Sequence, residues 1–392
     1  MRVCHIQGYY DPPRLVSARS GRVVLQAYPL IYHLPVELAR LGHEVTVLHH
    51  FHRREVFAEA GVQFEFVPPN FFSIGFGKLA ALFFRQYRFP YFQLAHGIIK
   101  RLEALQPEAI HYFGLNMTPN LWLVLRWAKK YRVPVVAHYH GGSPARRWLA
   151  RRIESDNLRW VSRVLFTTLE QAAAWQKAGL AADKVRLVLE TSSNFQPQSR
   201  AEARRRTGLD GAPIFVSAGR LHPIKDPFTV LRGFEKITTA WPAAKLYFFY
   251  RTAELLEEMK KEVLAKPLLA QRVKFCGEAA PAQMQDIFSS ADFFLQASRR
   301  EFSSCAVLEA MACGAIPVVS DIPPFRVMTE NGRYGRLFPV GDPEALAQKA
   351  LGINGDAIGR HAQEVREKFL RDLSFAAMAN RIEAIYFSSE QK

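Results

Sequence analysis

Short apolar runs alternate with longer amphipathic segments along the whole chain. The runs are rich in Val, Ile, Leu and Phe and lack a clean alternation of apolar and polar positions, as expected for strands buried on both faces. Amphipathic helices are predicted between them, for example over 118–130 and 169–178. In the first half of the chain, the predicted strands are 2–7, 44–49, 63–67, 109–113, 133–139, 163–168 and 185–190.

The pattern pauses at 191–212, a polar segment with Pro and Gly, and then restarts with predicted strands. Strand–helix alternation of this kind predicts an α/β fold with two Rossmann-like, doubly wound parallel sheets. We expect an N-terminal domain over 1–195, a C-terminal domain over 196–365, and a closing helix over 366–392 that crosses back to the first domain. Because binding sites of open parallel sheets lie at the carboxyl ends of the strands, two such domains facing each other would enclose a cleft. The predicted strands of the second half are 213–218, 245–250, 272–276, 292–297 and 316–320.

Length and composition support this division. A chain of 392 residues is too long for one hydrophobic core. The sequence contains no apolar run of about 18 residues, and its start, MRVCHIQGYY, does not resemble a signal peptide. The four cysteines lack the spacing of a zinc site or a redox pair, so we expect mostly buried, reduced thiols and a cytoplasmic protein.

The net charge is +16, and most of the excess lies in residues 1–190. Such a charge attracts phosphate-rich partners, which include nucleic acid, an anionic lipid surface and a phosphorylated substrate. No nucleic-acid-binding module is recognisable, so we expect no nucleic-acid partner. An NAD enzyme is disfavoured, because no G-x-G-x-x-G follows the first predicted strand.

Two cations follow the strand predicted at 213–218. In SAGRLHPIKDP, Gly219 permits a sharp turn, after which Arg220 and Lys225 project from a loop at the carboxyl end of the strand. Arg supplies a planar fork and Lys a mobile point charge, and together they suit a diphosphate. Taken alone, the pair also fits ordinary surface cations on a turn.

A second candidate segment, SRREFSSCAVLEAMACG, follows the strand predicted at 292–297. Ser303 or Ser304 can cap a helix that begins near Cys305, and the free amides at its start form an anion site. Glu301 precedes this helix and Glu309 lies within it, in an E-x7-E spacing. One carboxylate can accept hydrogen bonds from sugar hydroxyls and the other from a ribose.

Together these motifs resemble the retaining family 4 glycosyltransferases, which have the GT-B fold. The resemblance rests on SAGRLHPIKDP, on E-x7-E within REFSSCAVLEAMACGAIPVVSDIPPFR, and on GRYGRLFPVGDPEALA. It is strong over about 212–350 and weaker over 1–190, where LGHEVTVLHH resembles the second strand of the family. The glycine-rich loop that follows the first strand in the family is not evident in GYYDPPRLVSARSG.

The resemblance implies a role for each matching residue. Arg220 and Lys225 match the cations on the donor diphosphate, and Glu309 matches the carboxylate on the nucleoside ribose. Glu301 matches the carboxylate that touches sugar hydroxyls. His140, in VVAHYHGG, matches the histidine beside the sugar, although a turn histidine bonded to backbone also fits. We expect His49, His50 and His52 to form a solvated strand end.

The implied activity is transfer of a sugar from a nucleoside-diphosphate donor to an acceptor hydroxyl, with retention of configuration. Arg220, Lys225 and the amides near Ser303, Ser304 and Cys305 would stabilise the charge that grows on the phosphate. We expect no cofactor and no metal, because no D-x-D motif lies at a strand end. The alternatives are a GT-B enzyme of another reaction, such as an epimerase or phosphorylase, and a non-catalytic partner subunit.

The acceptor is left open between a sugar, a glycolipid and a small molecule. The segment 71–92, FFSIGFGKLAALFFRQYRFPYF, is rich in aromatics and carries only basic charges. It fits an amphipathic stretch in an anionic membrane interface, which would place the protein peripherally on the inner face of a membrane. It also fits a buried helix packed on the sheet with its cations at the rim.

Overall fold

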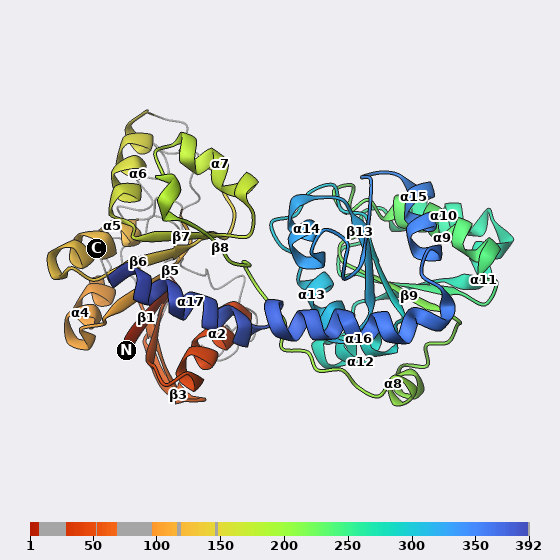
Figure 1. Cartoon of the computed structure of the whole chain (residues 1–392), viewed down its shortest axis with the longest axis horizontal. Coiled ribbons are helices and arrows are strands. Elements are labelled where there is room, and N and C mark those ends of the chain that lie inside the picture. The colour runs from red at the N-terminus through yellow and green to blue at the C-terminus, as the bar shows by residue number, and fades with distance from the viewer. Residues whose placement is uncertain (8–28, 52, 69–95, 116–118, 146–147, 391–392) are drawn as a thin grey trace. The chain divides into compact units, whose positions relative to one another are not determined.

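A computed structural model describes residues 1–7, 29–51, 53–68, 96–115, 119–145 and 148–390 of the chain. The chain forms two compact units: an N-terminal unit, Met1–Glu190 with Phe375–Lys392, and a C-terminal unit, Thr191–Ser374. Each unit is an α/β domain in which helices cover a mainly parallel sheet (Figure 1).

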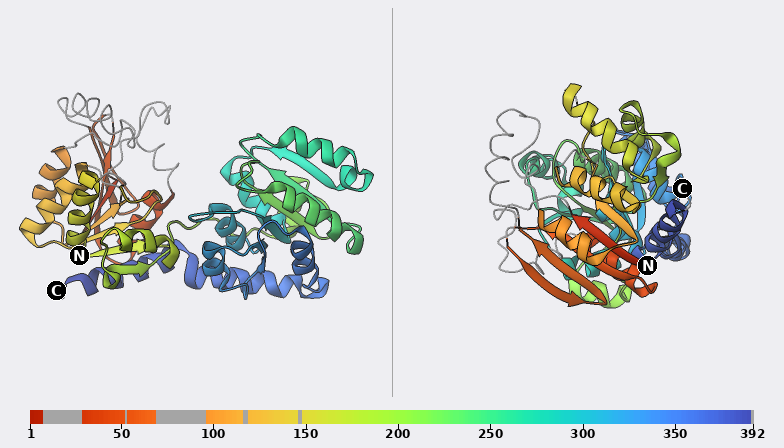
Figure 2. Two further views of the ribbon diagram at one scale, coloured as in Figure 1. Left: turned by 90° about the horizontal axis from the view of Figure 1, so that it is seen from above. Right: turned by 90° about the vertical axis from the view of Figure 1, so that its left-hand side faces the viewer.

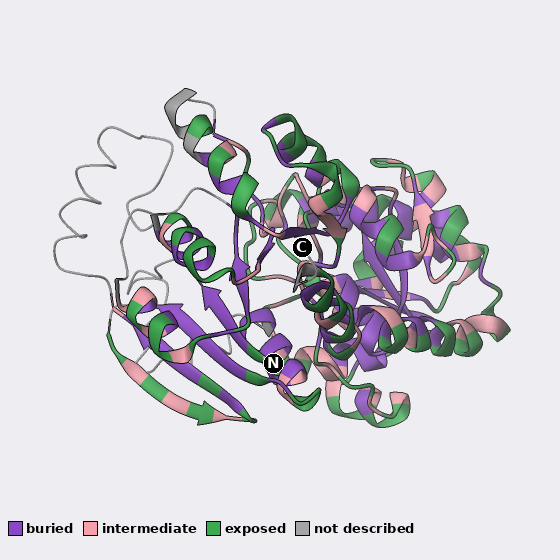
Figure 3. Cartoon of the chain, turned by 60° about the vertical axis from the view of Figure 1, so that its left-hand side comes forward, coloured by how far each residue is buried: buried purple, intermediate pink, exposed green. Residues whose placement is uncertain are grey.

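The described part of the N-terminal unit forms an eight-stranded sheet in the order β3-β4-β2-β1-β5-β6-β7-β8. All neighbouring strands pair in parallel except β3 with β4, which are antiparallel. The inner strands are buried along most of their length, which explains their unbroken apolar sequences (Figure 3). The strands are β1 (Arg2–Gln7), β2 (Glu44–His50), β3 (Glu55–Glu59), β4 (Val62–Val67), β5 (Ala109–Phe113), β6 (Val135–His138), β7 (Arg163–Phe166) and β8 (Val185–Leu187).

Helices cover the two faces of this sheet. On one face, α2 packs against α17, two helices far apart in the sequence. The other face is covered by helices whose apolar residues join the core of the sheet, and α5 there contacts α4 and α6. The described helices are α2 (Pro29–Arg40), α4 (His96–Leu105), α5 (Pro119–Tyr131), α6 (Trp148–Trp160), α7 (Leu169–Lys177) and α17 (Phe375–Glu390).

The C-terminal unit contains a six-stranded parallel sheet in the order β11-β10-β9-β12-β13-β14. Its strands are β9 (Ile214–Ala218), β10 (Lys245–Phe249), β11 (Val273–Gly277), β12 (Phe293–Gln296), β13 (Ile316–Ser320) and β14 (Arg336–Phe338). The views of Figure 2 show helices on both sides of the sheet. The helices of this unit are α8 (Arg200–Thr207), α9 (Pro227–Ala240), α10 (Leu256–Leu264), α11 (Pro267–Arg272), α12 (Pro281–Ser290), α13 (Cys305–Ala312), α14 (Pro323–Thr329), α15 (Pro343–Leu351) and α16 (Ile358–Lys368).

The chain passes between the units after Glu190 and after Ser374, whereas the sequence placed these boundaries at 195 and 365. The second difference arises because the π-helical turn Phe369–Leu373 continues α16 inside the C-terminal unit. The hydroxyl of Ser192 donates to the carbonyl of Leu373 at 2.5 Å, so the two crossing segments are tied to each other on the C-terminal side.

A row of buried histidines crosses the N-terminal sheet beneath α17. His5 and His111 are register partners on β1 and β5, and their rings stack with centroids 4.7 Å apart. The hydroxyl of Tyr386 lies 2.8 Å from His111 Nδ1 and 3.4 Å from His5 Nε2. On the neighbouring β6, His138 Nε2 lies 2.9 Å from the carbonyl of Leu189, to which it donates. Burial lowers the pKa of His5 to about 3 and holds the pKa values of His111 and His138 well below their ordinary value.

Several local expectations are wrong. His49 and His50 are buried rather than solvated, and His50 Nδ1 lies 3.0 Å from the amide nitrogen of Asn120. The four cysteines are free thiols, but only Cys4 and Cys313 are buried, while Cys276 and Cys305 are exposed. The antiparallel edge strand β3 was not predicted, because its residues are only partly buried and lack an apolar run.

The aromatic, basic segment 71–92 lies outside the described residues, as does His52. The structure therefore leaves both interpretations of 71–92 as predictions. Within the described residues, no helix is long and apolar enough to cross a membrane.

Candidate functional site

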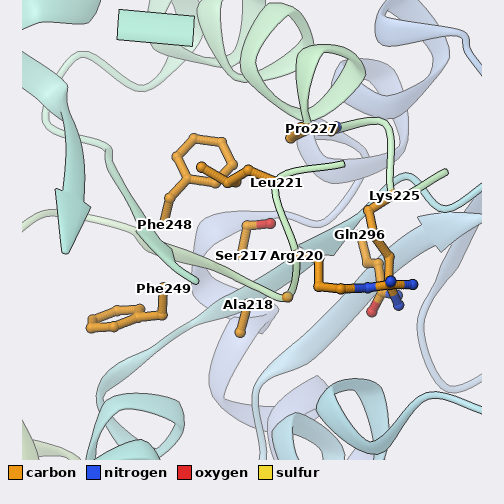
Figure 4. Close-up of a pocket in the computed structure, with 10 residues that line it drawn as sticks. Ser217, Ala218, Arg220, Leu221, Lys225, Pro227, Phe248, Phe249 and Gln296 are labelled. Atoms are coloured by element: carbon orange, nitrogen blue, oxygen red, sulfur yellow. The ribbon is translucent and has the colours of Figure 1, made fainter. Parts of the chain in front are cut away.

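The order of strands in the C-terminal sheet identifies where a ligand would bind. The chain winds outward from β9 through β10 to β11, then returns to β12 on the other side of β9 and continues to β14. Strand order therefore reverses between β9 and β12, and loops leaving a reversal point separate to open a crevice at the carboxyl ends. A pocket lies here, lined by residues that follow β9 and by Gln296 at the end of β12 (Figure 4).

The loop after β9 carries the two predicted cations. Gly219 has φ of +153°, which an L side chain rarely adopts, and its amide donates to the carbonyl of Phe249. The Arg220 side chain is exposed and lines the pocket, and no hydrogen bond or ion pair joins its guanidinium to any other described residue. Lys225 lines the same pocket from the end of the loop. Arg220 is therefore an uncompensated cation in a concave site.

Lys225 is ion-paired with Glu301, which the sequence had placed in the same site but not in contact. The pair is largely shielded, with 20% and 10% of the two side chains exposed. Glu301 Oε1 also accepts from Gln296 Nε2 at 2.8 Å and from Ser298 Oγ at 2.6 Å. All three donors bond Oε1, so in the described structure Oε2 keeps its capacity to accept from a ligand.

The loops after β9 and β12 are joined by further contacts. The backbone amide of Arg299 donates to the carbonyl of Ile224 at 2.9 Å, and its guanidinium donates to Asp226 Oδ2 at 2.8 Å. Asp226 also begins α9, where its carboxylate accepts from the amide of Thr229. These bonds hold Lys225 between two fixed neighbours, which orients its ammonium group before any ligand binds.

The start of α13 lies directly after this loop. Ser304 is the N-cap residue, as one of the two sequence alternatives proposed, but its side chain makes no capping bond. Its hydroxyl donates instead to Gln296 Oε1 at 3.0 Å. The hydroxyl of Ser303 is buried and has no partner in the described part of the chain. The start of α13 therefore lacks a side-chain cap.

Glu309 lies on α13, one turn after Cys305, and is partly buried. Burial raises the pKa of its carboxyl to about 7. No described side chain donates a hydrogen bond to it, in contrast to Glu301. A carboxyl of this kind gains from donors that a ligand brings, and the paired hydroxyls of a ribose are such donors.

His140 lies in the N-terminal unit, two residues beyond β6. Its Nδ1 is 3.4 Å from Glu190 Oε1. The contact of this nitrogen is therefore with a carboxylate, and not with the backbone as in a turn histidine. The other nitrogen, Nε2, is buried without a described partner, and the ring contacts those of Phe113 and His138. The neighbouring carboxylate favours a proton on Nδ1 and leaves Nε2 as the nitrogen available for other contacts.

The sequence missed Gln296, Ser298 and Glu190 as partners of the predicted residues. Gln296 is the last residue of an otherwise apolar strand. A polar residue at the carboxyl end of a strand could have indicated that Gln296 belongs to the site. Nothing in the sequence indicated that Glu190 would lie beside His140. Among the described residues, no group of three His, Cys, Asp or Glu side chains is placed to hold a metal ion.

Comparisons with known proteins identify the family. A model of the group 1 glycosyl transferases matches residues 199–363, and a model of the glycosyl transferase 4-like domain matches residues 29–189. The two models follow one another along most of the chain, one on each unit. The chain belongs to the GT4-like glycosyltransferases of the GT-B fold.

Individual relatives are distant. Sulfoquinovosyl transferase SQD2 of Arabidopsis thaliana is 27% identical over 73% of this chain and 59% of its own length. Phosphatidyl-myo-inositol mannosyltransferase of Mycolicibacterium smegmatis is 27% identical over 64% of this chain and 62% of its own. The chain therefore matches less than two thirds of either relative. Among solved structures, Anabaena HepE in complex with UDP is similar, with a TM-score of 0.67 and 16% sequence identity. The match covers 99% of this chain and 100% of the HepE chain, and it shows a shared fold.

Proposed function

We propose that the chain transfers a sugar from a nucleoside-diphosphate sugar to an acceptor hydroxyl, with retention of anomeric configuration. The proposal is carried by the unpartnered Arg220 guanidinium beside the Lys225–Glu301 pair, at the carboxyl ends of β9 and β12. A site with two cations and a helix start that lacks a side-chain cap suits the two phosphates of a leaving nucleoside diphosphate.

Each residue then has a defined task. Arg220 and Lys225 neutralise the charge that grows on the phosphate oxygens as the sugar–oxygen bond breaks, with help from the amides around Ser303, Ser304 and Cys305. Glu301 accepts sugar hydroxyls through Oε2, and Glu309 accepts the ribose hydroxyls.

Bond breaking and acceptor attack occur on the same face of the sugar in a retaining transfer. The acceptor proton can then pass to the departing phosphate, so no side chain is assigned as base or nucleophile. His140 belongs to the N-terminal unit, and its role beside the sugar stays a prediction from the family resemblance.

The names of similar proteins support the substrate classes. HepE was solved with UDP, a nucleoside diphosphate. The mannosyltransferase relative acts, by its name, on phosphatidyl-myo-inositol, which favours including lipid-linked hydroxyl acceptors among those tested.

A thermal-shift panel of nucleotide sugars tests donor binding. A ligand at about 100 times its Kd adds about 2.7 kcal/mol to the unfolding free energy, so one donor should raise the Tm clearly above the others. The matched control is Arg220→Ala, which should lose the shift because it removes the free cation. No shift with any nucleotide sugar, or an equal shift in the variant, would contradict the proposed site.

Product analysis with the selected donor then distinguishes the reactions. NMR of the anomeric proton should show transfer to the acceptor with the configuration of the donor. An inverted product would overturn retention. Conversion of the donor without any acceptor would favour an epimerase, and sugar phosphate formed from inorganic phosphate would favour a phosphorylase.

A further inference from the structure

We propose that the outer surface of α5 and α6 docks the protein on an anionic lipid surface. This surface, called here the α5–α6 face, belongs to the N-terminal unit and does not include any residue of the segment 71–92. Its members are the exposed cations and tryptophans of the two helices: Trp122, Arg126, Lys129, Lys130, Arg151, Arg152, Arg159 and Trp160.

The sequence of α5 divides cleanly between core and surface. Its apolar residues Leu121, Val124, Leu125 and Ala128 are buried in the core of the sheet. The opposite stripe contains Trp122, Arg126 and Lys129, at the spacing that places residues on one side of a helix. The sheet therefore already buries the apolar side of the helix. On the opposite side, Trp122 remains 40% exposed.

Cations lie over the exposed aromatic rings at two places on this face. The guanidinium of Arg126 lies 4.8 Å from the centre of the Trp122 ring, and Lys129 Nζ lies 3.4 Å from the centre of the Trp160 ring. The second contact joins α5 to α6, so the two helices present one surface. Trp160 is 49% exposed, although such a large apolar side chain is normally covered in a soluble domain.

The charge of this face is almost entirely positive. Asp156 is the one exposed acidic residue in the described parts of α5 and α6, and it pairs with Arg159 at 3.7 Å. The other cations of the face form no ion pair with a described residue. Lys129, Lys130 and Arg159 lie in the last turns of their helices, where a positive charge interacts favourably with the helix dipole. Arg126, Arg151 and Arg152 lie elsewhere on the helices, so the dipole does not account for them.

This combination fits a lipid surface better than a polynucleotide. Indole rings prefer the level of the lipid headgroups, and long cationic side chains beside them reach the lipid phosphates. Single-stranded nucleic acid is usually held in a basic groove in which bases stack. The α5–α6 face consists instead of the outer sides of two adjacent helices, and none of its members lines the pocket of the donor site.

The test is co-sedimentation of the full chain with vesicles of phosphatidylcholine alone or mixed with phosphatidylglycerol, at low and high salt. We expect salt-sensitive binding to the mixed vesicles only. The combined variant Arg126→Ala, Lys129→Ala, Lys130→Ala should bind about a hundredfold more weakly, because each cation near an anionic surface contributes about fivefold. Far-UV circular dichroism and the Tm confirm that the variant is folded.

The matched control removes three exposed cations that lack ion pairs in the described C-terminal unit, with Arg205→Ala, Lys261→Ala and Lys349→Ala. This control should bind like the wild type. Equal weakening by both variants would overturn the proposal, because net charge rather than this face would then govern binding.

Two further measurements complete the test. Trp160→Phe should remove part of the tryptophan blue shift that mixed vesicles induce, because Trp160 enters the interface. No binding at low salt would overturn the proposal. Binding to a single-stranded oligonucleotide but not to vesicles would also overturn it and assign the face to nucleic acid.

Discussion

Lys225 forms an ion pair with the same oxygen of Glu301 that Gln296 and Ser298 also bond. The cation that we propose for the phosphate and the carboxylate that we propose for the sugar are thus parts of one hydrogen-bonded unit. Removal of either partner would leave the other shielded and uncompensated. The Arg220 guanidinium has no such counterpart among the described residues.

This difference predicts distinct behaviour of the two cations. Arg220→Ala and Lys225→Ala should each slow transfer by roughly 100- to 1000-fold, because each removes a charge that stabilises the leaving phosphate. Lys225→Ala should also be non-additive with Glu301→Gln, whereas Arg220→Ala should combine additively with it. A double-mutant cycle on kcat/KM measures the coupling. Near-normal turnover in both alanine variants would remove the central claim about the donor site.

The raised pKa of Glu309 predicts how donor binding depends on pH. The ionised carboxyl is the better acceptor for ribose hydroxyls, so donor affinity should fall as pH drops through about 7. Glu309→Gln should weaken donor binding at pH 8 and remove this pH dependence, whereas Glu301→Gln should mainly lower kcat. Calorimetric titration of the donor between pH 6 and 8 measures the effect. The same profile in wild type and Glu309→Gln would contradict the assignment.

The raised pKa of Glu309 also predicts how the stability of the fold depends on pH. Stability should fall as pH rises, whereas donor affinity should increase. The folded pKa of Glu309 lies above the ordinary value, so the carboxyl destabilises the fold increasingly as pH rises from about 4.5 to about 7. Glu309→Gln should therefore raise the Tm at pH 8 but have little effect at pH 4. An unchanged Tm at pH 8 would show that burial of this carboxyl has little energetic consequence.

Metal independence is a prediction from the cations of the site. Transfer should persist in excess EDTA, because Arg220, Lys225 and the α13 amides meet the phosphate charge. The control is a known metal-dependent glycosyltransferase in the same assay. Loss of activity that magnesium or manganese restores would show that the side chains are insufficient.

The contact between Glu190 and His140 predicts that the carboxylate positions the imidazole. His140→Ala should lower kcat by roughly 100-fold if the ring stabilises charge near the sugar. Glu190→Ala should lower kcat less and alter its pH profile, and Glu190→Gln should restore part of the loss by keeping a polar side chain beside the ring. Identical rates and profiles in wild type and Glu190→Ala would refute the positioning role.

The buried histidine row predicts acid sensitivity of the N-terminal unit. Histidines whose folded pKa is depressed bind protons more readily in the unfolded chain, so stability falls as pH drops below about 6.5. Each can contribute up to about 1.4 kcal/mol per pH unit until its folded pKa is reached, which for His5 is about 3. His5→Phe should therefore flatten the acid-unfolding profile. Tryptophan fluorescence measures it, because every tryptophan except Trp241 lies in the N-terminal unit.

By itself the sequence determined the repeating strand–helix order, the parallel sheets and the position of Arg220, Lys225, Glu301 and Glu309 next to strand ends. These features are local, because apolar runs specify strands and the residues that follow a parallel strand must lie at one edge of the sheet.

Only the tertiary structure decided which side chains touch. The Lys225–Glu301 pair joins residues 76 positions apart, and the contact of His140 with Glu190 depends on how distant strands align. Burial of His49 and His50 and the depressed pKa of His5 likewise depend on helices that cover the sheet. Distances and local dielectric are set by the assembled chain, and no pattern within a short segment encodes them.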